Sequence, residues 1–260
     1  MLVEDTALYG RIPILGVHGL SQLLQVDGLN ILYDVGSDYR VLLNNAAFLG
    51  VNLRDVDVVV LSHGHYDHGN DLHRVLQVIG KKEIPVIVHK EVFSKKPPLS
   101  LNTTPEDIKY WGGRLIYIEK PYRIGDNILI SGTVPRLKGN PHHPVLDDGG
   151  NVVDEVVDDM SIFIDLGEKG IAVFTGCGHS GIINIVEYAR ELWGKQRICC
   201  VVGGLHGQKQ GREVVQRSID FLKGLGADVL APMHCSAGIR DGLRDEPSFM
   251  GLCSGSVLEI

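Results

Sequence analysis

The feature that most constrains this fold is a short apolar run, Val58–Leu61, which ends in a cluster of metal-binding side chains. Its β-branched residues continue without polar alternation, which predicts a strand buried on both faces. His63 and His65 follow the run, and Asp67 and His68 come next. Residues two apart in extended backbone project to the same side, so the imidazoles of His63 and His65 should point the same way. Asp67 and His68 follow in the turn, which gives two neighbouring sets of ligands, His63 with His65 and Asp67 with His68.

The donor atoms of this cluster indicate which metals it could bind. Imidazole nitrogens with one carboxylate suit zinc, or iron or manganese, better than calcium or magnesium. The alternative is a polar loop with histidines that have no function. Four ligand-type residues directly after a buried strand are difficult to explain by packing, so we interpret the cluster as part of a metal site.

Three further histidines follow strands in the last third of the chain. His179, His206 and His234 each come shortly after an apolar run, and the segments after the first two runs have helical spacing. The intervals of 27 and 28 residues match one strand plus one helix, so the three histidines should emerge at one edge of a sheet. Ligands of open α/β sheets gather at such edges. These histidines could therefore supply the remaining metal ligands.

Two other segments have more than one interpretation. Asp34 ends a predicted strand, where it could orient a ligand histidine or cap the turn. The segment 137–160 lacks periodicity and is expected to be a lid loop or a disordered excursion. His142 and His143 within it could reach a substrate, although a solvated loop is the simpler interpretation.

Strands and helices predicted elsewhere also suggest an α/β protein. Around residues 11–15 and 21–26 the apolar residues come in short runs that predict paired strands, and Asp27-Gly28 predicts a hairpin turn before the strand at 29–33. The segment 72–79 has the spacing of an amphipathic helix closed by a glycine. At 260 residues, we expect a single domain over residues 1–260.

Composition excludes several classes of protein. The net charge of −7 argues against broad electrostatic binding of nucleic acid, including an RNA-processing nuclease. The five cysteines form no C-x-x-C pair and no even disulfide framework. Neither a signal peptide nor a run of membrane length is apparent, so we expect a cytoplasmic protein without a membrane partner. The sequence does not indicate an oligomeric state.

The pattern His63-Gly-His65-Tyr-Asp67-His68 resembles the H-x-H-x-D-H signature of the metallo-β-lactamase superfamily. Further pieces resemble a narrower group within it, the group named for a synthase of the methanopterin pathway. That synthase joins a dihydropterin to a ribofuranosyl-aminobenzene phosphate. The pieces that carry this second resemblance are Gly-Leu-Ser at 19–21, Gly-Cys-Gly-His-Ser-Gly at 176–181, Gly-Gly-Leu-His at 203–206 and Met-His-Cys at 233–235.

The resemblance implies a four-layer αββα sandwich with mixed sheets and two divalent metal ions, most simply zinc, with iron or manganese as alternatives. It assigns one metal to His63, His65 and His179, and the other to Asp67, His68 and His234.

One position departs from the family pattern. The superfamily commonly has a metal-bridging aspartate after a Thr-Gly pair, but Cys177 follows that pair here. His206 could replace this carboxylate as a ligand or serve as an acid, and Cys177 could itself be a ligand or a neutral turn residue.

The activity expected from the resemblance is that of a dinuclear metal-dependent hydrolase acting on a small molecule. A hydroxide held by the two metals would attack an ester or phosphoester. Asp67 would orient this nucleophile, and His206 would donate a proton to the leaving group. The alternative is a synthase that uses the same metals for group transfer with a phosphorylated or pterin-like substrate. A purely structural metal site is disfavoured because such sites close with four ligands.

Overall fold

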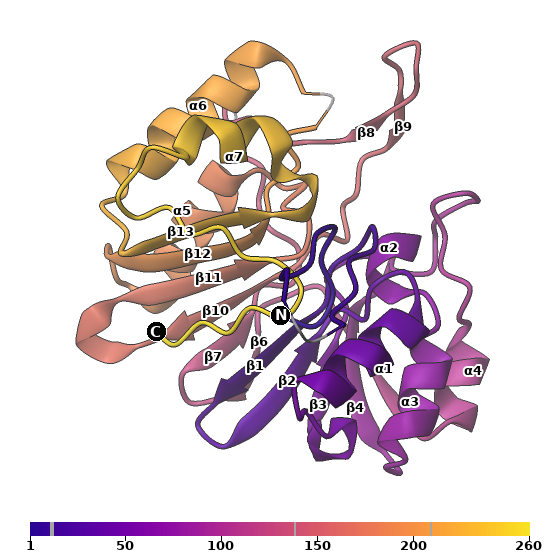
Figure 1. Cartoon of the computed structure of the whole chain (residues 1–260). Coiled ribbons are helices and arrows are strands. Elements are labelled where there is room, and N and C mark those ends of the chain that lie inside the picture. The colour runs from indigo at the N-terminus through magenta and orange to yellow at the C-terminus, as the bar shows by residue number, and fades with distance from the viewer. Residues whose placement is uncertain (11–12, 138, 209) are drawn as a thin grey trace. The chain divides into compact units, whose positions relative to one another are not determined.

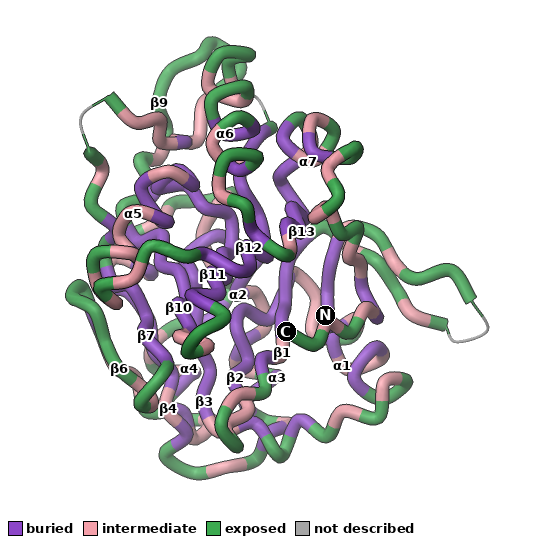
Figure 2. Tube along the Cα trace, turned by 90° about the vertical axis from the view of Figure 1, so that its left-hand side faces the viewer, coloured by how far each residue is buried: buried purple, intermediate pink, exposed green. Residues whose placement is uncertain are grey.

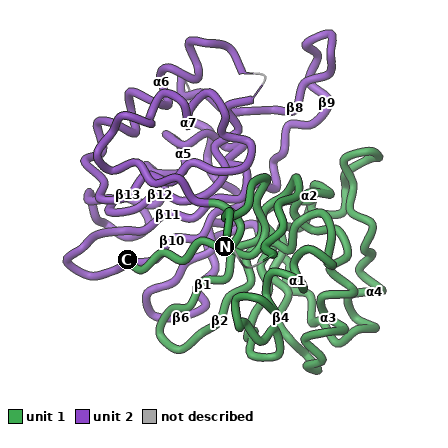
Figure 3. Tube along the Cα trace, in the orientation of Figure 1, with its two compact units in different colours: residues 1–118, 253–260 green, residues 119–252 purple. Residues whose placement is uncertain are grey.

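The computed structural model describes residues 1–10, 13–137, 139–208 and 210–260. The chain divides into two compact units, Met1–Ile118 with Cys253–Ile260 and Glu119–Leu252 (Figure 3). Each unit contains one large sheet and its own hydrophobic core. Whether the two units fold as one domain stays a prediction.

A five-stranded sheet with the order β1-β2-β3-β4-β5 lies at the centre of the first unit (Figure 1). β1 is antiparallel to β2, whereas β2 to β5 run parallel to their neighbours, so the sheet is mixed. Its strands are β1 (Gln22–Val26), β2 (Leu29–Tyr33), β3 (Val58–Val60), β4 (Ile84–His89) and β5 (Gly113–Ile118).

Four helices accompany this sheet, and the larger ones pack their apolar faces on it (Figure 1). They are α1 (Tyr39–Phe48), α2 (Tyr66–Gly69), α3 (Leu72–Ile79) and α4 (Pro105–Tyr110). Local sequence signals explain where they begin and end. Asp38 caps α1, Thr104 and Asp107 form a capping box at α4, and Gly80 ends α3 in the left-handed region.

The second unit has a six-stranded mixed sheet with the order β13-β12-β11-β10-β7-β6. β11, β12 and β13 are parallel, whereas β10, β7 and β6 each pair antiparallel with the strand before them in this order. The strands are β6 (Tyr122–Gly125), β7 (Ile128–Ile130), β10 (Ser161–Asp165), β11 (Ile171–Thr175), β12 (Ile198–Gly204) and β13 (Val229–Met233).

Three helices pack on this second sheet and complete its core (Figure 1). They are α5 (Ile182–Trp193), α6 (Arg212–Gly224) and α7 (Ala237–Leu243). Each of α5 and α6 connects two neighbouring parallel strands, as the repeating strand–helix pattern of the sequence predicts. The α/β class with mixed sheets is confirmed.

The central strands of both sheets are buried, and the outward faces of the helices are exposed (Figure 2). All three valines of β3 are buried, and so is every residue of β11 and β12. The uninterrupted apolar runs that the sequence shows at these positions therefore mark strands covered on both faces. Within the part of the chain that the structure describes, no helix is both long enough and apolar enough to cross a bilayer.

Two expectations from the sequence need correction. Part of the segment 137–160 is ordered as a hairpin of β8 (Val145–Leu146) and β9 (Val152–Asp154), whose turn is held by the side chain of Asp147, so this part is not a disordered excursion. Whether the segment acts as a lid stays a prediction. The strand expected at 21–26 is present as β1. Of the strand expected at 11–15, residues 11 and 12 lie outside the described residues, and residues 13–15 form no strand.

Candidate metal centre

Parallel strands place the first cluster of polar side chains at one edge of the first unit's sheet. β2 and β3 are parallel neighbours, so Asp34 and Ser62 follow the ends of adjacent strands. Asp34, His63 and His68 have no exposed surface, and His65 is only 5% exposed. Burial of so many polar groups is costly unless they bind one another or a ligand.

The sequence left open whether Asp34 orients a ligand histidine or caps the turn. In the structure its carboxylate orients a predicted ligand, His68. Oδ2 of Asp34 lies 2.7 Å from Nδ1 of His68, and both oxygens also accept hydrogen bonds from Ser62 at 2.7 Å. A carboxylate can only accept, so Nδ1 of His68 carries the proton and Nε2 presents its lone pair. Such a partner is typical of metal-ligating histidines.

The same carboxylate also fixes His63, through the hydroxyl of Ser62. Ser62 Oγ donates its one hydrogen to Asp34 and lies 2.9 Å from Nδ1 of His63. With that hydrogen committed, the hydroxyl can only accept from His63. Nδ1 of His63 is therefore the donor, and its Nε2 atom is the one left to bind a metal.

The distances between donor atoms fit metal ions. Nε2 of His63 lies 2.9 Å from Nδ1 of His65, and Nε2 of His68 lies 3.9 Å from Oδ2 of Asp67. Two donors of one zinc ion can be at most about 4.2 Å apart, because each bond is about 2.0–2.2 Å long. Both pairs satisfy this limit, so the residues present fit divalent cations of the zinc type.

The second unit places its three histidines as the sequence predicts. β11, β12 and β13 are parallel neighbours, and His179, His206 and His234 follow their ends in that order. The ring centroids of His179 and His206 are 4.0 Å apart. His179 and His234 are buried, and His206 is partly buried. All three therefore gather at one edge of this sheet.

His179 is held by the segment that precedes β8, and its neighbour Ser180 is held by the segment that precedes β10. Its Nδ1 atom donates to the carbonyl oxygen of His143 at 2.6 Å, and the amide of His143 donates back to the carbonyl of His179 at 2.7 Å. The next amide, that of Ser180, donates to the buried carboxylate of Asp159 at 2.8 Å. Because Nδ1 is used as a donor, His179 presents Nε2 for a metal. Burial raises the pKa of Asp159, against the hydrogen bonds from Ser180 that lower it.

Strained backbone occurs at three of the predicted positions. Asp34, His206 and His234 have positive φ angles of 59°, 42° and 48°. Such conformations are costly for residues with a side chain and persist where the surrounding structure enforces them. The backbones of β11 and β12 also approach closely at the end of β12, where a Cβ atom on Gly203 would lie 2.1 Å from the carbonyl oxygen of Thr175.

Cys177 lies among ligand-type groups rather than in a neutral turn alone. One ligand atom from each of Cys177, His179 and His206 lies within 4.8 Å of the others, and the same holds for Cys177, His234 and Cys235. The amide of His206 donates to Sγ of Cys235 at 3.2 Å. Burial would raise the pKa of Cys235, but hydrogen bonds with Cys177 and His206 lower it well below its usual range.

The structure also places the loop histidines whose role the sequence left open. His142 is partly exposed, with its Nε2 atom 3.3 Å from Oε2 of Glu155, whereas His143 is fully buried, with its ring centroid 6.3 Å from that of His206. Burial, and secondarily the neighbouring His206, lowers the pKa of His143 to about 4. His143 therefore supports the histidine cluster from inside the unit instead of lying in a solvated loop.

Sequence reasoning missed several residues around the cluster. Ser62 and the backbone of His143 each hold a predicted ligand, and Asp159 accepts from the amide of Ser180, the residue after His179. Their spacing in the sequence gives no signal because these contacts depend on tertiary structure. His18 was also missed, although it precedes the Gly-Leu-Ser motif. Its Nε2 atom lies 3.2 Å from Oδ2 of Asp67.

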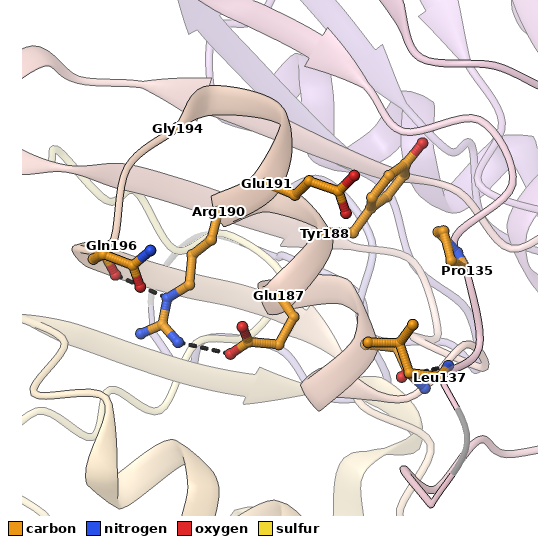
Figure 4. Close-up of a pocket in the computed structure, with 9 residues that line it drawn as sticks. Pro135, Leu137, Glu187, Tyr188, Arg190, Glu191, Gly194 and Gln196 are labelled. Carbon is orange, nitrogen blue, oxygen red and sulfur yellow. Dashed lines mark hydrogen bonds and ion pairs between the residues drawn. The ribbon is translucent and has the colours of Figure 1, made fainter.

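A pocket of about 450 Å³ lies along α5 in the second unit (Figure 4). Its walls include the ion pair of Glu187 with Arg190 and the ring of Tyr188. None of the residues that line it is one of the predicted site residues. We therefore do not assign this pocket to the chemistry of the histidine clusters.

The sequence of this chain matches the model of a known protein family. The model described as "Metallo-beta-lactamase superfamily" matches residues 16–234, a span that contains all seven predicted site residues. The chain belongs to the metallo-β-lactamase superfamily. Proteins of this superfamily generally bind divalent metal ions, in agreement with the donor distances above.

Within the superfamily, two curated proteins of Methanocaldococcus jannaschii are similar to the chain over most of their length. A 7,8-dihydropterin-6-methyl-4-(beta-D-ribofuranosyl)-aminobenzene-5'-phosphate synthase is 30% identical over 96% of this chain and 89% of its own. An uncharacterized protein is 34% identical over 91% of this chain and 89% of its own. The first match confirms the resemblance to the narrower group.

A solved metallo-β-lactamase-superfamily structure agrees with this assignment. The crystal structure of a metal-dependent hydrolase of the superfamily aligns with a TM-score of 0.78 and 25% identity, covering 100% of this chain and 97% of that one. This match confirms the metallo-β-lactamase-like fold predicted from the sequence. Together with the named relative, it identifies the chain as an enzyme of the hydrolytic or group-transfer type.

Proposed function

We propose that the chain is a metal-dependent group-transfer enzyme that joins a dihydropterin to a phosphorylated ribofuranosyl-aminobenzene. The observation that carries this proposal is the 30% identity to a synthase of that name, over 96% of this chain and 89% of the relative. A match of this extent covers both histidine clusters and the segments that support them. It favours a shared reaction over a similarity limited to the fold.

The residues proposed to hold two divalent cations are six of the groups described above. They are His63, His65 and His179 for one cation, and Asp67, His68 and His234 for the other. Bound cations would polarise substrate oxygens and neutralise negative charge, as a phosphorylated substrate requires. The hydrogen bonds of Asp34 and of the His143 carbonyl support this role, because they leave Nε2 of His68 and His179 as the ligating atoms.

The remaining chemistry is proposed for side chains of the chain itself. Asp67 orients the reacting group, and the imidazole of His206 transfers the proton that accompanies bond formation or cleavage. His206 suits this role because it is partly exposed, at the end of β12, next to His179. An imidazole can give or take a proton near neutral pH.

A second candidate is the metal-dependent hydrolase that the sequence first suggested, acting on an ester or phosphoester. The specific observation in its favour is the similarity over the whole chain to a solved metal-dependent hydrolase at 25% identity. The two candidates share the same ligands and differ in what attacks the substrate. Water attacks in the hydrolase, whereas an arylamine attacks in the synthase.

One experiment separates the candidates. Protein loaded with zinc, manganese or iron(II) is given a dihydropterin that carries a leaving group on its 6-methyl carbon, together with ribofuranosyl-aminobenzene phosphate, and the coupled product is measured by mass spectrometry. Parallel assays use a generic ester and a phosphodiester. Metal-dependent coupling supports the synthase, and turnover of the ester or phosphodiester without coupling supports the hydrolase. Elemental analysis of the same protein should give two metal equivalents per chain, and one equivalent would contradict the dinuclear proposal.

A further inference from the structure

His18 lies between two carboxylates of the first unit. Its Nδ1 atom is 3.4 Å from Oδ1 of Asp5, and its Nε2 atom is 3.2 Å from Oδ2 of Asp67. The side chain of His18 is 50% exposed, whereas that of Asp67 is 11% exposed. Packing in the core does not explain a half-exposed imidazole in this position, but the two acceptors on either side of the ring do.

The backbone around His18 is fastened to the same two aspartates. The amide of Gly19 donates to Oδ1 of Asp5 at 3.1 Å, and the amide of Leu20 donates to the carbonyl oxygen of Asp67 at 3.1 Å. The hydroxyl of Ser37 donates to the carbonyl oxygen of His18 at 2.5 Å. These hydrogen bonds fix the backbone of the loop on the H-x-H-x-D-H motif, and so keep the Cα atom of His18 next to Asp67.

Gly19 shows how closely this loop approaches the motif. Its φ angle is +142°, and a Cβ atom at this position would lie 2.5 Å from the carbonyl oxygen of Asp67. A side chain would therefore force the loop away from the motif. Glycine is therefore needed at this position of the Gly-Leu-Ser segment, because the close contact with Asp67 places His18 next to that residue.

We propose that His18 is a positioning residue, which holds the carboxylate of Asp67 in the orientation needed for metal binding while Asp5 holds the imidazole. The proposal rests on the proposed role of Asp67 as a metal ligand. Oδ2 of Asp67, the oxygen next to His18, is also the one 3.9 Å from Nε2 of His68. A carboxylate oxygen can accept a hydrogen bond and bind a cation together, and partners of this kind restrict the ligand to one orientation.

The test compares variants by their affinity for metal and by the visible spectrum of the cobalt(II) protein. His18→Ala should bind cobalt ~10–100-fold more weakly in competition with a chelator, the range found when partners of ligands are removed. It should still reach the same stoichiometry at saturation, with altered cobalt d–d bands. His18→Gln should recover part of the affinity, since its amide can donate to Asp67 but cannot reach both aspartates as an imidazole does. Asp5→Ala should weaken binding in the same direction.

Controls keep the outcomes distinct. His73→Gln changes another histidine of the same unit, which lies 2.9 Å from the hydroxyl of Thr103 and contacts no predicted ligand, so it should leave affinity and spectrum unchanged.

A His18→Ala protein with wild-type affinity and spectrum overturns the proposal, and so does one that loses a metal equivalent at saturation, because His18 would then be a ligand. A changed KM with unchanged metal binding would make it a substrate contact and also overturn the proposal. If Asp67→Asn also binds metal normally, the proposed metal site itself fails.

Discussion

Oδ2 of Asp34 lies 2.7 Å from Nδ1 of His68, and neither side chain has any surface exposed to solvent. The same carboxylate accepts from the amide and the hydroxyl of Ser62, and that hydroxyl accepts from His63. One buried aspartate thus sets the protonated nitrogen of two predicted ligands. Both ligands belong to the H-x-H-x-D-H motif, but each is assigned to a different metal.

Asp34→Asn should weaken metal binding at both ligands. An amide has one acceptor atom, and its NH₂ group would have to face Ser62 or His68, where the structure requires an acceptor. We expect metal affinity to fall by ~10–100-fold and the free energy of unfolding by about 1–3 kcal/mol, since a buried donor loses its partner. Chelator competition measures the affinity, and urea unfolding measures the stability. An Asp34→Asn protein with both quantities unchanged would show that the carboxylate only fills space.

His65→Ala and Asp67→Ala should abolish turnover while leaving folded proteins. Both residues follow the end of β3, whereas the core of the first unit is built from apolar residues of the sheet and helices. Loss of a ligand therefore removes metal without opening that core. Activity, metal content and thermal melting monitored by circular dichroism are measured on each variant. Two unfolded variants would indicate that the metals serve the fold, and the proposal of an enzyme site at these residues would then be wrong.

Sequence alone predicted the elements that carry strong local signals. The valines of β3 and the apolar runs before His179, His206 and His234 indicated buried strands, and the interval of one strand plus one helix predicted adjacent parallel strands. These signals predict structure well for two reasons. A continuous apolar run fits a strand that is buried on both faces, and right-handed strand–helix–strand connections leave few possible topologies for the sheet.

The supporting contacts of the site could not be predicted in the same way. The partner of His179 is a backbone carbonyl, that of residue 143, which any amino acid provides. Likewise, the hydroxyl of Ser62 acquires its role only from the position of Asp34, a residue on another strand. The hairpin at 145–154 was missed because its strands are two and three residues long, too short to show a period.

The buried imidazole of His143 should make stability depend on pH. Burial lowers its pKa from 6.5 to about 4, so the folded protein favours the neutral ring, whereas the unfolded chain takes up a proton near pH 6.5. This contribution to stability is present above about pH 6.5 and is lost as the pH falls through about 4. Its full size is roughly 3 kcal/mol, from 1.36 kcal/mol for each pH unit of the shift.

His143→Leu should therefore lose less stability than the wild type between pH 7 and pH 4. Melting temperatures of both proteins are measured over this range at constant metal concentration, and the difference between the two curves isolates the contribution of residue 143. Leucine is similar in size to histidine, does not titrate, and leaves the hydrogen bonds between the backbone of residue 143 and His179 in place. Parallel curves would contradict the assignment of a neutral, buried imidazole.

His206 could either transfer a proton in the reaction or bind a metal, and a variant can separate these two roles. Both proposed ligand sets are complete without it, and its ring lies beside that of His179 with 4.0 Å between centroids. His206→Asn should lower turnover by ~10²–10⁴-fold, as expected for a lost general acid, with both metal equivalents retained. Turnover is followed in the coupling assay and with the ester and phosphodiester, and metal content is measured by elemental analysis. Loss of one metal equivalent would instead make His206 a ligand, together with Cys177 and His179, since one ligand atom from each of the three lies within 4.8 Å of the others. The proton donor would then have to be sought at His142, which lies in the segment before β8 and is partly exposed.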